Sequence, residues 1–376
     1  MERIYLDHAA TTPLDKEVFE KMTPYFTGDF GNADSPHAFG RKAVNAVDFA
    51  RDKMAELLGA KPYEIYFTSG GTESDNWALL GAAYAQKENG KTHIIVSAIE
   101  HHAVKAAAEK LEREGFEVTY LSANEQGIIQ PALVKAALRE DTGLVAVMYV
   151  NNETGAKQPV REIAALAHEK GALFFTDAVQ AAPHLPLQVK DLGADLLAIS
   201  SHKFYGPKGC GVLYIRSGVR VKGLIVGGEQ ERGLRGGTTN VPCVVGCAAA
   251  YEKAVRGMQE NNAKIKLLRD VFLQELEGLD GVKINGECVP ALLNLQISGV
   301  NNVDLVYAAD LQGVGISAGA ACASASVKPS HVLLAMGMSE VQAKESVRIS
   351  FGKDNTEEEV RKAAKIIKEI ILRLRS

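Results

Sequence analysis

Strand-like and helix-like segments alternate along most of this chain, from about residue 16 to residue 255. Short apolar runs predict strands, and the stretches between them have the apolar spacing of amphipathic helices. We expect strands at residues 64–68, 93–97, 117–121, 144–149, 173–176, 196–199 and 212–215. We expect helices at residues 41–58, 72–86, 103–114, 131–138 and 160–170. This alternation indicates an α/β fold with a doubly wound, mostly parallel sheet.

The pattern changes after about residue 259. A long charged helical stretch comes first, followed by short strands at 292–297, 315–317 and 347–351. The last helix has its own start signal, because Thr356 and Glu359 are spaced as a capping box. At 376 residues the chain also exceeds the roughly 250–300 at which single cores stop growing. We therefore predict a large domain at 16–258 and a smaller α/β domain formed by 1–15 and 259–376.

Composition and charge narrow the range of partners. The formal net charge is −4, so no basic surface favours nucleic acid. No apolar stretch approaches the roughly 18 residues of a membrane span. The first residues carry acidic side chains and do not read as a signal peptide. We expect a cytoplasmic protein that binds neither nucleic acid nor membranes.

The five cysteines include one in an unusual setting. Five is an odd number and no C-x-x-C pair occurs, so neither a disulfide framework nor a zinc site is indicated, and we expect no metal. Cys322, however, lies in the run from Ser317 to Ser326, and all of the remaining residues in this run are Gly, Ala or Ser. Small neighbours give a thiol little packing, which suits a nucleophile that must move. The alternative is a tight structural contact between small residues.

Polar residues suited to one chemistry follow the ends of successive predicted strands. A Gly-rich turn before Gly71 and Thr72 opens a helix, where backbone N–H groups could bind phosphate or simply be capped. Asp177 ends one apolar run and Lys203 follows another. A lysine amine for an aldehyde and a carboxylate for a pyridinium nitrogen are the parts that a pyridoxal 5′-phosphate (PLP) enzyme requires. Each residue alone would more often be a cap, a turn acid or a solvated lysine.

Other candidates remain ambiguous on their own. Gln180 could reach the same pocket as Asp177, and His101 could cover an aromatic cofactor and relay protons or could be solvent-facing. A second Gly-rich turn at 233–240 offers the hydroxyl of Thr238. Arg348 lies inside an apolar strand and needs a carboxylate partner, either from a substrate or from an internal acid.

Together these residues resemble the NifS/IscS-type cysteine desulfurases, which are class-V aminotransferases with the aspartate-aminotransferase fold (PLP fold type I). The resemblance runs essentially end to end, and its combination of motifs is highly specific. It is carried by residues 5–13, 31–32, 68–76, 100–101, 150–155, 177–180, 202–203 and 231–238, by Cys322 and by Arg348.

The resemblance implies a cofactor and a role for each site residue. PLP would be attached to Lys203, with Asp177 at the pyridine nitrogen, Gln180 at the ring hydroxyl and His101 stacked on the ring as an acid/base. Asn152 would neighbour both cofactor and substrate. The implied phosphate donors are Gly71, Thr72, Ser200, His202 and, from the second subunit of a homodimer, Thr238. The substrate carboxylate would be bound by Asn32 and Arg348.

The implied reaction converts L-cysteine to L-alanine and leaves a persulfide on Cys322. The sulfur would pass to an acceptor, such as an iron–sulfur scaffold protein, for cluster or thio-cofactor synthesis, and Cys322 could be a transient cluster ligand there. A selenocysteine lyase or another fold-type-I PLP enzyme is the alternative, and a non-enzymatic partner subunit is a second one. Three departures from the family pattern concern Ser201 (usually Gly), Ala318 and Ala320 (usually hydroxyl residues), and a C-terminus without an extended tail.

Overall fold

The computed structural model describes residues 3–286, 289–319 and 328–376. Its largest sheet has seven strands in the order β2-β8-β7-β6-β5-β3-β4. The strands are β2 (Ile65–Thr68), β3 (His93–Ser97), β4 (Glu117–Leu121), β5 (Thr142–Ala146), β6 (Leu173–Asp177), β7 (Leu196–Ser200) and β8 (Gly211–Ile215). Strands β3 to β7 pair in parallel, whereas β8 is antiparallel to both β2 and β7. The predicted α/β fold with a mostly parallel sheet is confirmed.

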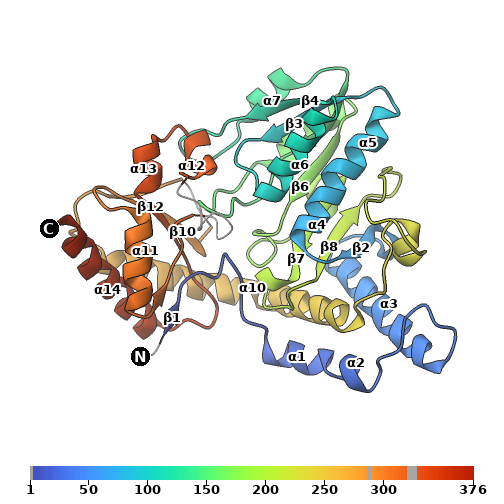
Figure 1. Cartoon of the computed structure of the whole chain (residues 1–376), viewed down its shortest axis with the longest axis horizontal. Helices are drawn as coiled ribbons and strands as arrows, with labels where there is room; N and C mark the ends of the chain where they lie inside the picture. The colour runs from blue at the N-terminus through green and yellow to red at the C-terminus, as the bar shows by residue number, and fades with distance from the viewer. Residues whose placement is uncertain (1–2, 287–288, 320–327) are drawn as a thin grey trace.

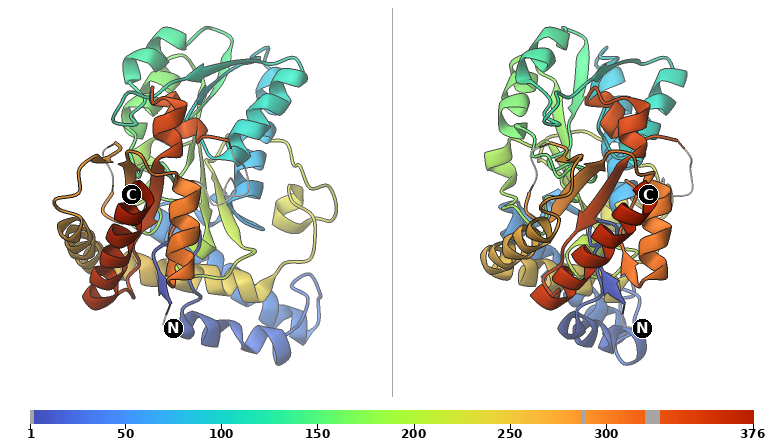
Figure 2. Two further views of the ribbon diagram at one scale, coloured as in Figure 1. Left: turned by 60° about the vertical axis from the view of Figure 1, so that its left-hand side comes forward. Right: turned by 90° about the vertical axis from the view of Figure 1, so that its left-hand side faces the viewer.

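The strands of this sheet are apolar because both of its faces are covered. Along β7, Leu197 and Ile199 belong to one core cluster, whereas Leu196 and Ala198 belong to the other. Side chains alternate between faces along a strand, so a strand buried on both sides needs a continuous apolar run. Figure 2 shows helices on both faces of the sheet.

The helices follow the predicted positions closely. They are α1 (Lys16–Met22), α2 (Pro24–Thr27), α3 (Ala38–Leu58), α4 (Gly71–Asn76), α5 (Ala82–Lys87), α6 (His102–Arg113), α7 (Pro131–Ala137), α8 (Val160–Glu169), α9 (Val189–Leu192), α10 (Val241–Glu275), α11 (Asn302–Leu311), α12 (His331–Ala335), α13 (Glu340–Lys344) and α14 (Glu357–Arg375). The helix predicted at 72–86 is divided into α4, a π-helical turn at Trp77–Gly81 and α5. The strand predicted at 144–149 is shifted, since β5 begins at Thr142 and ends at Ala146.

A second, smaller α/β unit contains the remaining sheets. Strands β9 (Val282–Ile284), β10 (Leu292–Ile297) and β12 (Ser346–Ser350) form an antiparallel sheet in the order β12-β10-β9. Strand β1 (Ile4–Tyr5) pairs in parallel with β11 (Val314–Gly315), so the N-terminal strand lies with this unit. The capping box of α14 is present: Glu359 N donates to Thr356 Oγ1 and Thr356 N donates to Glu359 Oε2.

Helix α10 connects the two units. Figure 1 shows it running beneath both, and it contacts α1 and α3 at one end and α14 at the other. Its 35 residues continue through position 258, where the sequence had suggested a boundary, so the domain limits stay a prediction. Within the described residues, no helix has both the length and the hydrophobicity needed to cross a bilayer.

Candidate active site

The carboxyl ends of the large sheet open into a cavity of about 180 Å³. Ligands of open α/β sheets bind at this edge because the loops that follow parallel strands meet there. The cavity is lined by Ala9, Ala10, Gly71, Thr72, Asp75, His101, Met148, Asn152, Asp177, Val179, Gln180, Ser200, His202, Lys203 and Arg348. Ten of the residues predicted from the sequence are therefore brought together at one place: Gly71, Thr72, His101, Asn152, Asp177, Gln180, Ser200, His202, Lys203 and Arg348.

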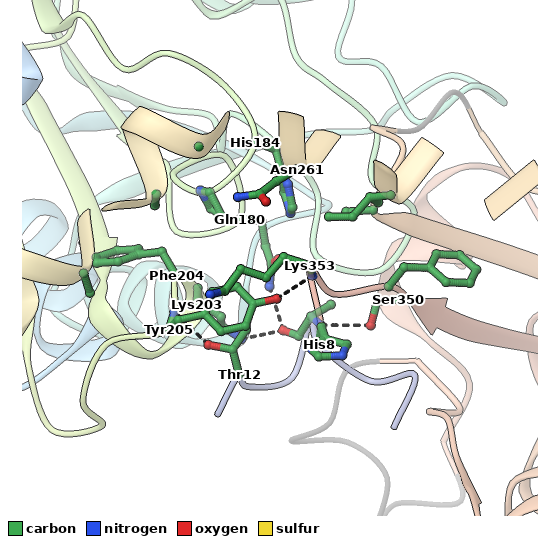
Figure 3. Close-up of a pocket in the computed structure, with 18 of the residues that line it drawn as sticks. His8, Thr12, Gln180, His184, Lys203, Phe204, Tyr205, Asn261, Ser350 and Lys353 are labelled. Atoms are coloured by element: carbon green, nitrogen blue, oxygen red, sulfur yellow. Dashed lines mark hydrogen bonds between the residues drawn. The ribbon is translucent and has the colours of Figure 1, made fainter. Parts of the chain in front are cut away.

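Lys203 follows β7 in a short 3-10 turn (Ser201–Lys203). Its Nζ donates to the carbonyl oxygens of Ala9 at 2.5 Å and Ala10 at 2.8 Å. Gln180 Nε2 donates to the same Ala9 oxygen at 2.9 Å. Figure 3 shows Gln180 and Lys203 at the wall of a second cavity of about 190 Å³, which Ala9 also lines. These three residues thus form the partition between the two cavities, and the amine is held at a defined place.

Asp177 is the last residue of β6 and is buried. Its Oδ1 accepts a hydrogen bond from Val179 N at 2.8 Å. Burial raises the pKa of Asp177 to about 6, although the backbone hydrogen bond and the charge of Lys203 oppose that rise. A carboxyl with this pKa is mostly ionised at neutral pH, as a partner of a protonated ring nitrogen must be.

His101 is the N-cap residue of α6, and its Nδ1 accepts a hydrogen bond from Ala103 N at 3.2 Å. Burial, with a contribution from the positive charge of Lys203, lowers the pKa of His101 to about 4. The ordinary pKa of histidine is roughly 6.5, so this imidazole is much less basic than an exposed one. At neutral pH His101 is uncharged, and because Nδ1 is an acceptor, its N–H lies on Nε2.

Close packing at the start of α4 explains the glycine there. A Cβ on Gly71 would lie 3.1 Å from Val179 Cγ2 and 3.5 Å from Ser200 Cβ. The first backbone N–H groups of α4 therefore lie near the hydroxyl-bearing residues Thr72 and Ser200 at the cavity wall. N–H groups and hydroxyls around a Gly turn form a donor set suited to a phosphate.

Arg348 is buried in β12 and has both kinds of partner that the sequence left open. Its Nη2 lies 2.8 Å from Asp7 Oδ1, and its Nη1 donates to Asn152 O at 2.8 Å. Its Nε has no hydrogen-bond partner among the described residues, and neither has Asn152 Oδ1. The internal acid is therefore present, and Arg348 also lines the cavity with its Nε left without a partner in the described part of the chain.

Three predicted site residues are not part of this cavity as the structure describes it. Asn32 lies before α3, where its Oδ1 accepts a hydrogen bond from Asp34 N. Thr238 is exposed and lines a different cavity, together with Glu231 and Arg235. Cys322 lies outside the described residues.

Other residues at or behind the cavity wall were not among the predicted site residues. Asp75 lies one helical turn after Gly71, so the i, i+4 spacing could have placed it on the same face. Ala9 and Ala10 contribute backbone carbonyl oxygens, for which their side chains give no signal. Asp7 could not be paired with Arg348 from the sequence, because 341 residues separate them.

Comparisons with known proteins agree with this geometry. The profile of the aminotransferase class-V family matches residues 4–362. The chain is 48% identical, over the full length of both proteins, to the putative cysteine desulfurase IscS 1 of Bacillus subtilis (strain 168). It is 45% identical to the cysteine desulfurase IscS of Methanosarcina thermophila, over 99% of this chain and 93% of that protein.

Solved structures give the same result. A NifS-like protein superposes with a TM-score of 0.93 at 37% identity, covering 98% of this chain and 99% of the other. SspA in complex with cysteine superposes with a TM-score of 0.82 at 36% identity, covering 94% of this chain and 99% of that one. Both identities are high enough to indicate kinship as well as a shared fold.

Enzymes of this family depend on PLP, and the cavity fits that group. The cavity is lined by an amine, an acid with a pKa of about 6, an uncharged imidazole and a set of hydrogen-bond donors suited to a phosphate. Orphaned polar atoms, Asn152 Oδ1 and Arg348 Nε among them, await a partner of this kind. The chain belongs to the class-V aminotransferase family, and within it to the NifS/IscS-type cysteine desulfurases.

Proposed function

We propose that this cavity removes sulfur from L-cysteine, giving L-alanine and a persulfide on Cys322 that is passed to an acceptor for iron–sulfur cluster or thio-cofactor synthesis. The observation that carries the proposal is the convergence of Lys203, Asp177, His101 and Arg348 on one cavity. These four groups supply an amine, an acid, an uncharged imidazole and a cation. A desulfurase needs all four around one amino-acid substrate.

Each residue has a proposed part in holding PLP. Lys203 would bind its aldehyde carbon, Asp177 would pair with the ring nitrogen and Gln180 with the ring hydroxyl. His101 would cover the ring, and the phosphate would be bound by Gly71, Thr72, Ser200 and His202, with Thr238 from a second copy. When bound, PLP supplies an electron sink for the electrons released at the substrate Cα.

Arg348 and Asn152 are the proposed contacts of the substrate. Arg348 Nε is the one nitrogen of a buried guanidinium that has no hydrogen-bond partner among the described residues, since the other two nitrogens bind Asp7 and Asn152 O. A substrate carboxylate is a strong acceptor for such a donor. Asn152 Oδ1 can accept from the substrate amine. Asn32 belonged to the same proposed clamp, but its contacts in the single chain do not support that part.

Lys203 and His101 are the proposed proton-handling groups. The Lys203 amine would be the base for the substrate Cα proton, and the carbonyls of Ala9 and Ala10 hold this amine in place. His101 donates through Nε2–H and can pass a proton at that atom, because its Nδ1 is occupied by the amide of Ala103. Hydrogen bonds of this kind fix the direction in which an imidazole acts.

Cys322 is the proposed sulfur acceptor. Its thiolate attacks the substrate sulfur, so that an S–S bond forms as the Cβ–S bond breaks. The electron pair of that bond stays with the carbon skeleton, which takes up protons and leaves as L-alanine. The sulfur is kept as a persulfide.

The flanks of the cysteine segment support this assignment. Ser317 pairs with Arg348 through two backbone hydrogen bonds, Ser317 N to Arg348 O at 3.1 Å and Arg348 N to Ser317 O at 2.7 Å. On the other side of the segment, Ser330 Oγ donates to Glu153 Oε2 at 2.5 Å. Both anchors adjoin residues of the cavity, Arg348 and Asn152. Cys322 is three residues from Gly319, a separation that spans at most about 11 Å of chain.

A homodimer is part of the same proposal, as are the domain limits given above and a cytoplasmic location. Thr238 is exposed and lines a cavity separate from the active-site cavity of its own chain, so it would have to act on the active site of a second copy. Large apolar side chains are also exposed on the surface: Val226 is 94% exposed, Phe49 71% and Phe30 64%. Exposed apolar surface of this kind favours contact with a second copy.

The test is cysteine turnover by the C322A variant. We expect C322A to keep its bound cofactor and visible absorption but to lose alanine formation from L-cysteine. Mass spectrometry should find one added sulfur atom on Cys322 of the wild-type protein after a single turnover. A transaminase would be unaffected by C322A, and a protein that stays colourless after PLP is added would be no PLP enzyme at all.

A further inference from the structure

Two further carboxyl groups lie close to Asp177 in the active site. Asp75, on α4, lines the cavity and is 1% exposed. Glu100, which precedes His101, is also 1% exposed. Glu100 Oε1 accepts hydrogen bonds from Ser97 Oγ at 2.5 Å and Met148 N at 2.7 Å. In contrast, Asp75 Oδ1 and Glu100 Oε2 have no hydrogen-bond partner among the described residues.

The charges around these acids do not balance if all three ionise. The titratable groups that line the cavity with Asp75 are His101, Asp177, His202, Lys203 and Arg348. Burial lowers the pKa of both histidines to about 4, so they are uncharged at neutral pH. Arg348 is already paired with Asp7. Besides Arg348, the described cavity wall then holds one cation, Lys203, whose charge stabilises ionised Asp177, whereas three buried carboxyl groups lie in this region.

Buried acids that share a site cannot all carry charge, so their proton affinities separate. Burial, reinforced by Asp177 and Glu100, raises the pKa of Asp75 well above its ordinary value. Burial also raises the pKa of Glu100 to about 8. The pKa of Asp177 rises least of the three, since Val179 N and Lys203 stabilise the charged form of this carboxyl. A phosphate group brought in by the cofactor adds negative charge and pushes in the same direction.

We propose that Asp75 is a positioning residue that keeps its proton in the folded protein and lines the cavity as a neutral hydrogen-bond donor, leaving Asp177 as the ionised carboxylate. A protonated Asp75 adds no second negative charge beside the ring nitrogen. It also gives the wall an O–H donor on α4, one turn beyond the phosphate-type donors Gly71 and Thr72. Asp177 can therefore be ionised while its neighbour Asp75 stays protonated.

The first experiment measures thermal unfolding of the full-length holoprotein between pH 5 and pH 9. A carboxyl that is protonated when folded but ionised when unfolded costs stability as pH rises above roughly 4, until the pH passes its folded-state pKa. Asp75→Asn cannot ionise in either state. We therefore expect the melting temperature of D75N relative to wild type to increase steadily from pH 5 to pH 8. Asp52→Asn, a change at an exposed position of α3, should show no such trend.

The second experiment follows the visible absorption band of the bound cofactor as a function of pH. Because Asn keeps a neutral side chain that can donate, D75N should keep the wild-type midpoint to within about 0.3 pH unit, a free-energy change of only about 0.4 kcal/mol. Asp75→Leu removes the donor and should weaken cofactor binding, which D75N should not do. A structural role in packing alone would not separate these two variants in this way.

Infrared spectroscopy tests the proton directly and does not depend on D75N folding. Wild-type protein at pH 7 should show the C=O stretch of a buried protonated carboxyl, and a band should remain in Glu100→Gln, which removes the other candidate. Loss of every such band in E100Q, a midpoint shift of a full pH unit in D75N, or a melting difference that does not change with pH would each overturn the proposal.

Discussion

The two walls of the active-site cavity treat buried charge in opposite ways. On the side of the small sheet, the charge of Arg348 is paired with that of Asp7 before any ligand binds, although its Nε has no hydrogen-bond partner among the described residues. On the side of the large sheet, the charge of Lys203 stabilises ionised Asp177, whereas Asp75 Oδ1 and Glu100 Oε2 have no hydrogen-bond partner among the described residues. A paired wall is rigid and positions a ligand. On the acidic wall, Asp177 is left as the carboxylate that a protonated ring nitrogen would pair with.

The largest effect should come from removing the amine of the acidic wall. In K203A we expect cysteine turnover to fall by about 10²–10⁴-fold or more, since a positioned proton-transfer group contributes that much and the covalent attachment is lost as well. Borohydride reduction should fix PLP to the wild-type protein but not to K203A. The exposed Lys208 gives the matched control, because K208A should behave as wild type.

The paired wall should respond mainly in stability. R348A leaves Asp7 without its partner, and breaking a buried pair costs about 3–5 kcal/mol, which urea unfolding would measure. Replacing both partners, in D7N/R348M, should recover much of the stability but none of the substrate affinity. If R348A is as stable as the surface variant R361A, the Asp7–Arg348 pair does not hold this wall together.

The acidic wall should show a pH effect that the paired wall lacks. The Asp177 carboxyl, with a pKa of about 6, is charged above that pH and gains a proton below it. We therefore expect the affinity for PLP to fall as the pH drops through 6, by up to about tenfold per unit. Equilibrium titration of PLP into cofactor-free protein from pH 5 to pH 8 measures this. In D177N the affinity should be lower throughout, and this part of the pH dependence should be absent.

His101 should contribute little to the pH dependence of PLP binding. Its pKa of about 4 keeps it uncharged from pH 8 down to pH 5. We expect the pH dependence of PLP binding in H101Q to match that of wild type, while cysteine turnover falls. A profile that flattens in H101Q would mean that the imidazole, and not the carboxyl, titrates in this range.

The smallest effect should lie far from both walls. T356A removes the hydroxyl that accepts the hydrogen bond of Glu359 N at the start of α14. The loss of a helix cap costs about 1 kcal/mol. Urea unfolding should detect it, and cysteine turnover should be unchanged. E358A, one position before the capping-box glutamate, serves as a control because Glu358 has no part in the cap.

Local sequence patterns predicted the strands well, because a strand buried on both faces must be apolar along its whole length. The capping box of α14 was equally local and was found. The single helix α10 was not predicted as one element, since Gly257 in its middle weakens a helical pattern. Packing against α3, α1 and α14 along its length overrides that weakness.

For the site, local patterns predicted which chemical groups are present and in which order: the lysine, the acid, the histidine and the Gly-rich turn each follow a predicted strand. Their protonation and pairing could be read only from the folded chain, as in the uncharged His101, the pairing of Arg348 with Asp7 and the Oδ1 of Asp75, which has no partner among the described residues. The reason is physical. Strand and helix patterns depend on neighbours a few residues away, whereas a pKa or an ion pair depends on burial and on charges hundreds of residues distant in the chain.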